Sequence, residues 1–557
     1  MIVATAARGG TPIGNAEGLS GPYATGWSYD SSAPTQSINV VFYVGGGLSN
    51  GVYAGSCPTM VNRVDVNSYF SITGIHGFRW FIPVQFHDGI NHALYGYCVD
   101  ASGTVTNQLY NTPTNFLIKP YPQFANDEPY MIGAWYFTAW SASNNFQAVN
   151  SKAVYGRQDA WGGVRDYALG ADPWNLHTDY SSRQPLLGFY DMLNQSVIDA
   201  HIRQAASAGL SFFAFYWYWD SDLHQESPIS YPAHTYVSSA IKQRMRFLIA
   251  PITLGANTLS LTEWETLVVP YITTNYLADP SYLTTQDGSP VVVMFWPRFT
   301  NNSDYADGIA FLKNYVFGAL GKTPLVLALY VSDTYGVDSL AGQGADGFAG
   351  FWNGPSAPAE PYTNSISLWT NYVAPGTGYF NMHGSSAGFD RRPWWQIGWG
   401  TSNDNVNADN YNTGITLDAF SNHMSTVKAY LDANSNATAK CTIIYAWNEW
   451  GEGGIIEPAA TLGYSRLDTV RSVFGLKPRL ARGPAAFSTM AKTNAAVAVT
   501  IQNLTSGITN SVEHTHDLIP TNGWSLLTNF VSATTQTSLV FGVSNTWDSA
   551  FFRITAK

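Results

Sequence analysis

The sequence predicts an α/β protein, a (β/α)8 barrel of the TIM type with a β-sandwich-like domain at each end. Two observations lead to this prediction. In the middle of the chain, apolar runs alternate with amphipathic stretches, and continuous apolar runs are typical of parallel strands buried on both faces. Toward both ends, short apolar runs are separated by Gly, Ser, Asn and Asp, which is typical of antiparallel sandwiches.

Residues 1–122 are expected to form the N-terminal sandwich and to contain only strands. Representative strands are predicted at 38–43 and 77–83, and a Pro-rich linker follows at 119–123. The first ten residues lack a basic head before an apolar stretch, so they do not predict a signal peptide.

Residues 123–478 are expected to form the barrel. Two amphipathic helices are predicted at 191–208 and 416–433, and Gly209 stands where a glycine often ends a helix. Eight strand–helix units favour a barrel over a doubly wound sheet, and no GxGxxG turn follows an early strand, which argues against dinucleotide binding. The eight strands are predicted at 131–137, 211–219, 247–252, 291–296, 325–331, 347–352, 394–399 and 441–447.

Residues 479–557 are expected to form a small C-terminal β domain. Strands are predicted at 496–501, 537–543 and 550–555.

Composition excludes several classes of function. Charged residues make up only 12% of the chain with a net charge of −11, and without a Lys/Arg cluster we expect no nucleic-acid partner. No apolar run reaches about 18 residues, so no membrane span is expected. No zinc-type Cys or His spacing occurs, and we expect no cofactor and no metal. Cys57 and Cys98 are candidates for a disulfide, and Cys441 for a buried thiol.

Aromatic residues are abundant at 15%, with 19 Trp and 33 Tyr. Flat rings beside polar groups suit the apolar faces and hydroxyls of sugars, so we expect an oligo- or polysaccharide as partner. A plain excess of aromatic residues in large β domains is the alternative. The sequence gives no oligomeric state.

The candidate catalytic residues are Glu449 and Glu452. In barrels of this kind the active site lies at the C-terminal ends of the strands, and the last strand ends with Trp447-Asn-Glu-Trp-Gly-Glu-Gly-Gly454. Two neighbouring carboxyls push their pKa values apart, so that one acts as an acid and the other as a base. Glycosidic cleavage needs this division of labour. The alternative is that one glutamate only forms a salt bridge with a neighbouring strand.

Other polar and aromatic residues at strand ends are candidates for substrate binding. Asp220 and Asp222 could equally cap a turn, Asp390 could pair with an arginine, and each aromatic residue could belong to the core. The full set of binding candidates is Trp135, Tyr136, Trp219, Asp220, Asp222, Asp333, Asp390, Asn448, Trp450 and Glu457.

The segment 447–458 resembles the signature of glycoside hydrolase family 99 and its family-99-like (WbsX-like) relatives, in which an Asn-Glu-Trp-x-Glu-Gly block runs on to Glu-Pro. Segments 188–191, 209–219 and 388–393 match the same proteins, and the resemblance covers roughly residues 128–475. Gly451 stands where mannan-cleaving members often carry a larger side chain.

This resemblance implies a retaining, endo-acting glycosidase for mannose-type glycans. Glu449 would act as base on the sugar's own 2-hydroxyl to give a 1,2-anhydro sugar. Glu452 would protonate the leaving oxygen and then activate water. Bacterial surface polysaccharide is the expected substrate, and an extracellular, cell-surface or phage-particle location is expected.

Three other interpretations stay open. Asn448-Glu449 is similar to the acid/base pair of another large group of retaining barrel glycosidases, although there the pair ends the fourth strand. A non-catalytic glycan-binding or structural protein would use the barrel as a scaffold. A polysaccharide-assembly glycosyltransferase would need a phosphate site for its activated donor.

Overall fold

The computed structural model describes most of the chain, which splits into two compact units. The described residues are 12–126, 128–141, 152, 159–172, 175–254, 258–295, 297–301, 304–330, 343–351, 355, 357–366, 379–394, 410–480, 486–492, 496–502, 509–515, 525–531, 537–542 and 551–556. One compact unit is built around residues up to 122, and the parallel sheet belongs to the other.

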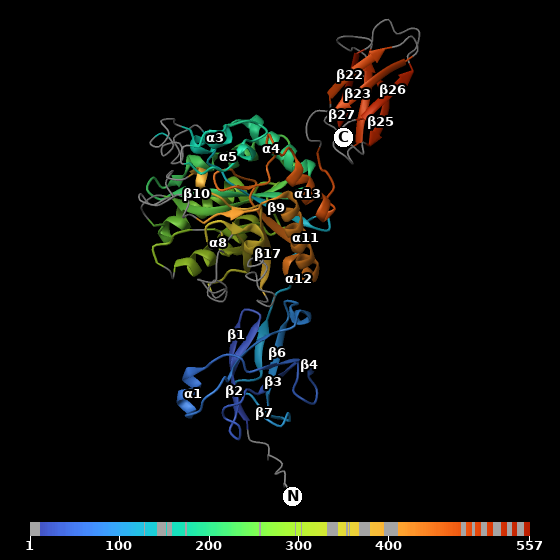
Figure 1. The fold of residues 1–557 in the computed structure, drawn as a ribbon. Coiled ribbons are helices and arrows are strands. Elements are labelled where there is room, and N and C mark those ends of the chain that lie inside the picture. Colours follow the sequence, from blue (N-terminus) through green and yellow to red (C-terminus); the bar gives the residue numbers. More distant parts are fainter. Residues whose placement is uncertain are drawn as a thin grey trace. The chain divides into compact units, whose positions relative to one another are not determined.

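The N-terminal unit consists of two antiparallel sheets that share one apolar core (Figure 1). Phe42 of one sheet stacks on Trp80 of the other at 4.1 Å between ring centroids. The first sheet contains β1 (Pro12–Ser20), β2 (Tyr23–Asp30) and β5 (Gly77–Phe81). The second contains β4 (Val52–Pro58), β3 (Asn39–Val44), β6 (Asn91–Val99), β7 (Val105–Gln108) and β8 (Thr114–Leu117).

Two expectations for this unit are wrong. A short helix, α1 (Val64–Phe70), interrupts the strands. Cys57 and Cys98 are both free, because they lie opposite Val40 on the two sides of β3. Strands two positions apart are separated by about 9–10 Å, which exceeds the roughly 7 Å that a disulfide can span between Cα atoms. Cys441 is a buried free thiol, as expected.

A curled parallel sheet forms the centre of the second unit. In the described part of the chain its neighbouring strands run in the order β12, β10, β9, β19, β17, β15, β14 and β13. The end strands β12 and β13 lie close to each other, so the sheet curls round on itself. The strands are β9 (Met131–Tyr136), β10 (Phe212–Asp220), β12 (Arg246–Leu254), β13 (Val291–Met294), β14 (Leu325–Tyr330), β15 (Gly347–Gly350), β17 (Phe380–Ser386) and β19 (Cys441–Tyr445).

Amphipathic helices cover the outside of this sheet (Figure 1). The two predicted helices are confirmed as α4 (Gln195–Ser207) and α11 (Leu417–Ala433), and Gly209 adopts the expected positive φ of 80°. The other helices of four or more residues are α3 (Gly162–Ala168), α5 (Tyr231–Val237), η5 (Trp264–Val268), α7 (Val269–Ile272), η6 (Thr273–Leu277), α8 (Asp304–Leu320), α12 (Ser435–Thr438) and α13 (Ser465–Phe474). None of the described helices has the length and apolar character needed to cross a membrane.

Short elements join these larger ones. They are η1 (Val84–Phe86), η2 (Ser181–Arg183), β11 (Gln225–Glu226), η3 (Pro228–Ser230), η4 (Lys242–Arg244), α6 (Leu261–Glu263), β16 (Glu360–Pro361), η8 (Arg392–Trp394), β18 (Asn412–Thr413), β20 (Asn448–Glu449) and β21 (Gly454–Ile455).

The strand before β19 differs from the prediction. The described strand that pairs with β19 on this side is β17. Of the predicted strand 394–399, Trp394 ends the 3-10 turn η8, and residues 395–399 lie outside the described residues. The sequence of β17, Phe-Asn-Met-His-Gly-Ser-Ser, lacks a continuous apolar run although every residue is buried. Residues 296, 331 and 352, which end three other predicted strands, also lie outside the described residues.

The C-terminal strands form two antiparallel sheets around a small core of Val497, Val499, Ile501 and Val512. One sheet contains β22 (Ala486–Lys492), β23 (Ala496–Gln502) and β26 (Thr537–Gly542). The other contains β25 (Ser525–Val531), β24 (Thr509–Thr515) and β27 (Phe551–Ala556).

Candidate active site

A tight hairpin after β19 carries both candidate glutamates. Strands β20 and β21 pair antiparallel, and the N–H groups of Glu452 and Gly453 donate to the carbonyl of Glu449 at 3.1 and 2.7 Å. Gly453 has a φ of 81°, which favours glycine. The turn therefore brings Glu452 back over Glu449.

Asn448 fixes this hairpin to the end of β9. Its amide nitrogen donates to the Phe137 carbonyl at 2.9 Å, and its amide oxygen accepts from the Phe137 N–H at 2.8 Å. Both atoms of the side chain are thus used within the protein, and Asn448 is completely buried. Asn448 positions the hairpin instead of presenting a free amide to a ligand.

Gly451 leaves no room for a side chain at the turn. A Cβ atom there would lie 2.2 Å from the ring of Trp394. The Trp394 indole occupies the space that a larger residue would need, which explains the glycine between Trp450 and Glu452.

Glu449 is buried and carries an unsatisfied oxygen. Its side chain is 4% exposed, and Oε2 has no hydrogen-bond partner within the described structure. Burial first, and then the negative charge of Glu452, raise the pKa of Glu449 well above its usual value, and an interaction with Tyr216 offsets this rise in part. Glu449 therefore holds a proton easily.

Glu452 has a different environment. It is half-buried, and its Oε2 accepts a hydrogen bond from the Tyr445 hydroxyl. Its main-chain carbonyl accepts from the Asp390 N–H at 2.6 Å. A hydrogen bond to a carboxylate favours the charged form, so Tyr445 stabilises Glu452 as an anion.

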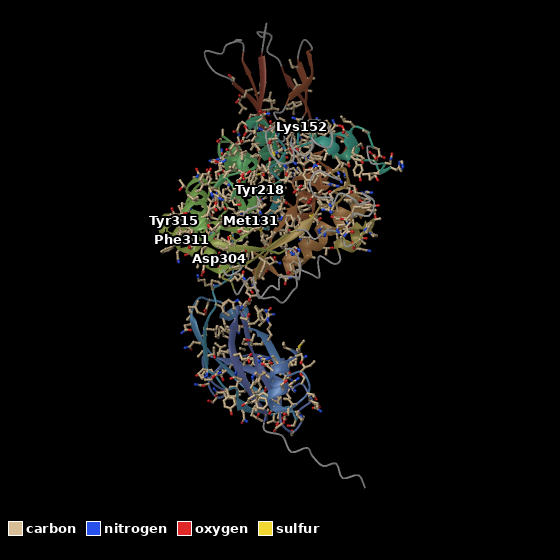
Figure 2. All side chains as sticks on the ribbon, turned by 90° about the vertical axis from the view of Figure 1, so that its left-hand side faces the viewer. Met131, Lys152, Tyr218, Asp304, Phe311 and Tyr315 are labelled. Carbon is tan, nitrogen blue, oxygen red and sulfur yellow. The ribbon has the colours of Figure 1, made fainter. Side chains whose placement is uncertain are left out.

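Three buried tyrosines surround the two glutamates. Burial first, and then the charges of Glu449 and Glu452, raise the pKa of Tyr216, Tyr218 and Tyr445 well above the usual value. All three phenols stay protonated and are hydrogen-bond donors. The Tyr216 hydroxyl is buried without a hydrogen-bond partner in the described residues, and Tyr218 lies within the body of the parallel-sheet unit (Figure 2).

Aromatic rings from several strands form a floor beneath these groups. Trp135 contacts Phe295 at 5.4 Å and Phe351 at 5.7 Å, and Phe351 contacts Tyr445 at 5.3 Å between ring centroids. Phe295 follows β13, Phe351 follows β15, and both are partly exposed. Neither residue was among the predicted binding residues, although both directly follow a buried strand, at the end where such sheets carry their active sites.

A sealed polar cluster supports the hairpin from behind. Glu457 accepts from Trp450 Nε1 at 2.8 Å and from the Tyr190 hydroxyl at 2.7 Å, and its other oxygen lies 3.0 Å from His201 Nε2. His201 Nδ1 lies 2.6 Å from the Tyr136 hydroxyl. Tyr136, Trp450 and Glu457 are at most 3% exposed, and their polar atoms form hydrogen bonds within this cluster.

The binding candidates near β10 are also used internally. Trp135 Nε1 donates to the Gly350 carbonyl at 3.1 Å, and Trp219 Nε1 donates to Glu263 at 2.7 Å. Asp220 accepts from the N–H groups of Asp222 and Leu223, both at 3.0 Å, which is the turn-capping alternative. Asp222 is exposed.

The two remaining candidates lie elsewhere. Asp390 forms a bidentate pair with Arg392 at 2.8 and 2.7 Å, which is the arginine-pairing alternative. Asp333 lies outside the described residues. Across the described ranges, no three His, Cys, Asp or Glu side chains gather in a way that could hold a metal ion.

Comparison with known proteins supports the expected resemblance for the segment around the hairpin. Residues 390–470, which include both glutamates, match a family model described as "Glycosyltransferase WbsX". The uncharacterised protein WxcX of Xanthomonas campestris pv. campestris strains B100 and ATCC 33913 is 43% identical over 49 residues. That match spans 9% of this chain and only 7% of the length of each curated relative.

Solved structures show weaker likeness. A GH99 endo-alpha-mannosidase from Bacteroides thetaiotaomicron aligns at a TM-score of 0.39 and 16% identity, covering 62% of this chain and 95% of that chain. A β-glucuronidase from Ruminococcus gnavus aligns at a TM-score of 0.26 and 10% identity, covering 83% of this chain and 67% of that chain.

Proposed function

We propose that this chain is a glycoside hydrolase that cleaves an oligo- or polysaccharide with Glu449 and Glu452 as its acid–base pair. The observation that carries the proposal is the unequal environment of these neighbouring carboxyls. Glu449 is buried with a raised pKa, whereas Glu452 accepts a hydrogen bond from Tyr445. Two carboxyls held in different protonation states are what glycosidic cleavage requires.

Burial and the charge of Glu452 favour a proton on Glu449. A base must be unprotonated, so the route through a 1,2-anhydro sugar, in which Glu449 is the base, starts only when this proton lies on Glu452. The two groups titrate as one coupled unit. The Tyr216 hydroxyl, which interacts with Glu449 and lowers its pKa in part, is a donor that a sugar hydroxyl could also use.

The finer parts of the proposal rest on the WbsX-like segment and on the fold. These parts are endo-acting cleavage with retention of configuration, a mannose-type or related bacterial surface polysaccharide as substrate, and a location outside the cell or on a phage particle. The curled sheet of eight strands, with β12 beside β13, supports a closed (β/α)8 barrel. The terminal pairs of antiparallel sheets support sandwich-like flanking domains.

The test is release of reducing ends from yeast mannan, bacterial O-polysaccharide and capsule preparations. Glu449→Gln and Glu452→Gln should each abolish release while thermal unfolding stays cooperative. Glu265→Gln, on the outer helical segment η5, is a matched control that should keep full activity. Near-normal turnover by either active-site variant would contradict the assignment.

A sugar transferase is the second candidate, because the matching family model is described as a glycosyltransferase. It would move a sugar from an activated donor to an acceptor glycan instead of to water. Incubation with nucleoside-diphosphate sugars and an acceptor polysaccharide separates the two functions. Donor-dependent growth of the acceptor, without any release of reducing ends, would favour the transferase.

A further inference from the structure

A cavity of about 500 Å³ lies behind the hairpin that carries the two glutamates. Three stretches of chain line it, residues 176–183, 390–415 in its described parts, and 453–466. Its volume falls within the range of roughly 300–1,000 Å³ that is typical of small-ligand sites. Gly453, directly after Glu452, forms part of its wall.

Three arginines line this cavity, and one of them is neutralised within the protein. Arg392 forms the bidentate pair with Asp390, and the Tyr180 hydroxyl donates to the same carboxylate at 2.9 Å. The ring of Tyr411 lies 3.3 Å from the Arg392 guanidinium. The charge of Asp390 is therefore already used by Arg392.

The other two guanidiniums are bonded to main-chain carbonyls. Arg183, only 6% exposed, donates to the carbonyls of Trp450 at 2.8 Å and Asp390 at 2.7 Å. Arg466 donates to the carbonyl of Ile455. Burial lowers the pKa of both groups, that of Arg466 to about 10, although Asp390 raises the pKa of Arg183 in part. Arg466 is half-buried, whereas Arg183 is a buried cation without a bonded carboxylate, which is unfavourable.

Two further acids line the cavity, and both have other partners. Asp179 caps the N–H of Ser181 at 2.8 Å. The carboxyl oxygens of Glu457 are hydrogen-bonded to His201, Tyr190 and Trp450. In the described lining, the charges of Arg183 and Arg466 are thus left without a bonded carboxylate.

We infer that this cavity binds the carboxylate of an acidic sugar residue, with Arg466 as its main cationic partner. The inference rests on the proposed function and names its substrate class, a polysaccharide that carries uronic acids or similar acidic units. Guanidinium groups match carboxylates geometrically. The neutral lining, with Thr178, Ser182 and Thr413, offers hydroxyls to the remainder of the sugar ring.

The test measures binding without turnover. Isothermal titration calorimetry with D-glucuronate, D-glucose and inorganic pyrophosphate is run on the full chain. We expect saturable binding of glucuronate and none of glucose. Arg466→Met removes the guanidinium that pairs with the carboxylate, so it should weaken glucuronate binding by roughly tenfold or more. Lys322→Met, which removes an exposed charge before β14, should leave it unchanged.

Each outcome decides the proposal. Equal binding of glucose and glucuronate, or unchanged affinity in Arg466→Met, would overturn it. Preference for pyrophosphate would also overturn it, in favour of the phosphates of an activated sugar donor. If Arg466→Met fails to fold, Arg466→Lys takes its place. Lysine keeps the positive charge but lacks the planar guanidinium with its paired N–H donors, so this variant should still weaken glucuronate binding. Glu449→Gln should bind glucuronate normally, so failure of hydrolysis and failure of this site are distinguishable.

Discussion

Removal of the Tyr445 hydroxyl should move the pH dependence of glycan hydrolysis toward alkaline pH. This hydroxyl donates to Oε2 of Glu452 and stays protonated, because burial and the two glutamates raise the pKa of Tyr445. A hydrogen bond to a charged group contributes about 1.5–3 kcal/mol, and one pKa unit corresponds to about 1.4 kcal/mol. Without the bond, ionised Glu452 loses this stabilisation and its pKa rises.

The acid limb of the kcat/KM profile of Tyr445→Phe should therefore shift upward, because it reports the first ionisation of the coupled pair, in which Glu452 becomes charged. The alkaline limb should move little, because Glu452 is already charged before the second ionisation. The assay is the initial rate of reducing-end release across the acid and neutral pH range. Tyr362→Phe is the control, because the hydroxyl of this buried tyrosine donates to the Ser386 main-chain carbonyl at 2.6 Å. An unchanged profile for Tyr445→Phe, or a shift to acid pH, would refute the reasoning.

Three further predictions concern stability. Glu449→Gln should make the free energy of unfolding less dependent on pH. The raised pKa of Glu449 stabilises the folded state in full below about pH 4, and this contribution is lost as the pH rises through the raised value. In urea titrations at increasing pH, the free energy of unfolding should therefore fall more for the parent protein than for the variant. Asn448→Ala leaves the buried N–H and carbonyl of Phe137 unpaired and should lower the free energy of unfolding by about 2–4 kcal/mol in urea titrations, whereas Asn434→Ala at the end of α11 should have a much smaller effect. Glu457→Gln places an amide NH2 where a carboxylate oxygen now meets Trp450 and Tyr190 or His201, so at least one buried hydrogen bond is lost and the free energy of unfolding should fall by about 1–3 kcal/mol. A double variant with His201→Gln that loses the full sum of the single effects would contradict direct coupling.

The sequence predicted the parts of the fold whose signal is local. Buried parallel strands such as β10 and β19 are continuous apolar runs, and α4 and α11 repeat apolar residues every three or four positions. Strand β17 was missed because its polar residues are buried by close packing against neighbouring strands. A Cβ on Gly350, for example, would lie 2.4 Å from the Gly384 nitrogen.

In the candidate site, too, the local features were predictable from the sequence, and the contacts between distant segments were not. The spacing of Glu449 and Glu452 was enough to predict that both carboxyls meet at a strand end. Their different environments were not predictable, because they depend on Tyr445 below the turn and on Tyr216 from another strand. The internal roles of Trp450 and Glu457 depend on His201, 256 residues from Glu457 along the chain, and no local pattern reveals such a contact.

The His201–Glu457 pair has a consequence for how the protein is made. It joins α4, an early helix of the parallel-sheet unit, to the segment that follows the last strand. During synthesis on the ribosome, His201 emerges long before its carboxylate partner, and β9 emerges long before its neighbour β19. A nascent chain that ends short of residue 457 therefore holds an imidazole without its hydrogen-bond partner and an uncovered sheet edge. Chaperone dependence should accordingly be greatest for fragments truncated between α4 and β19.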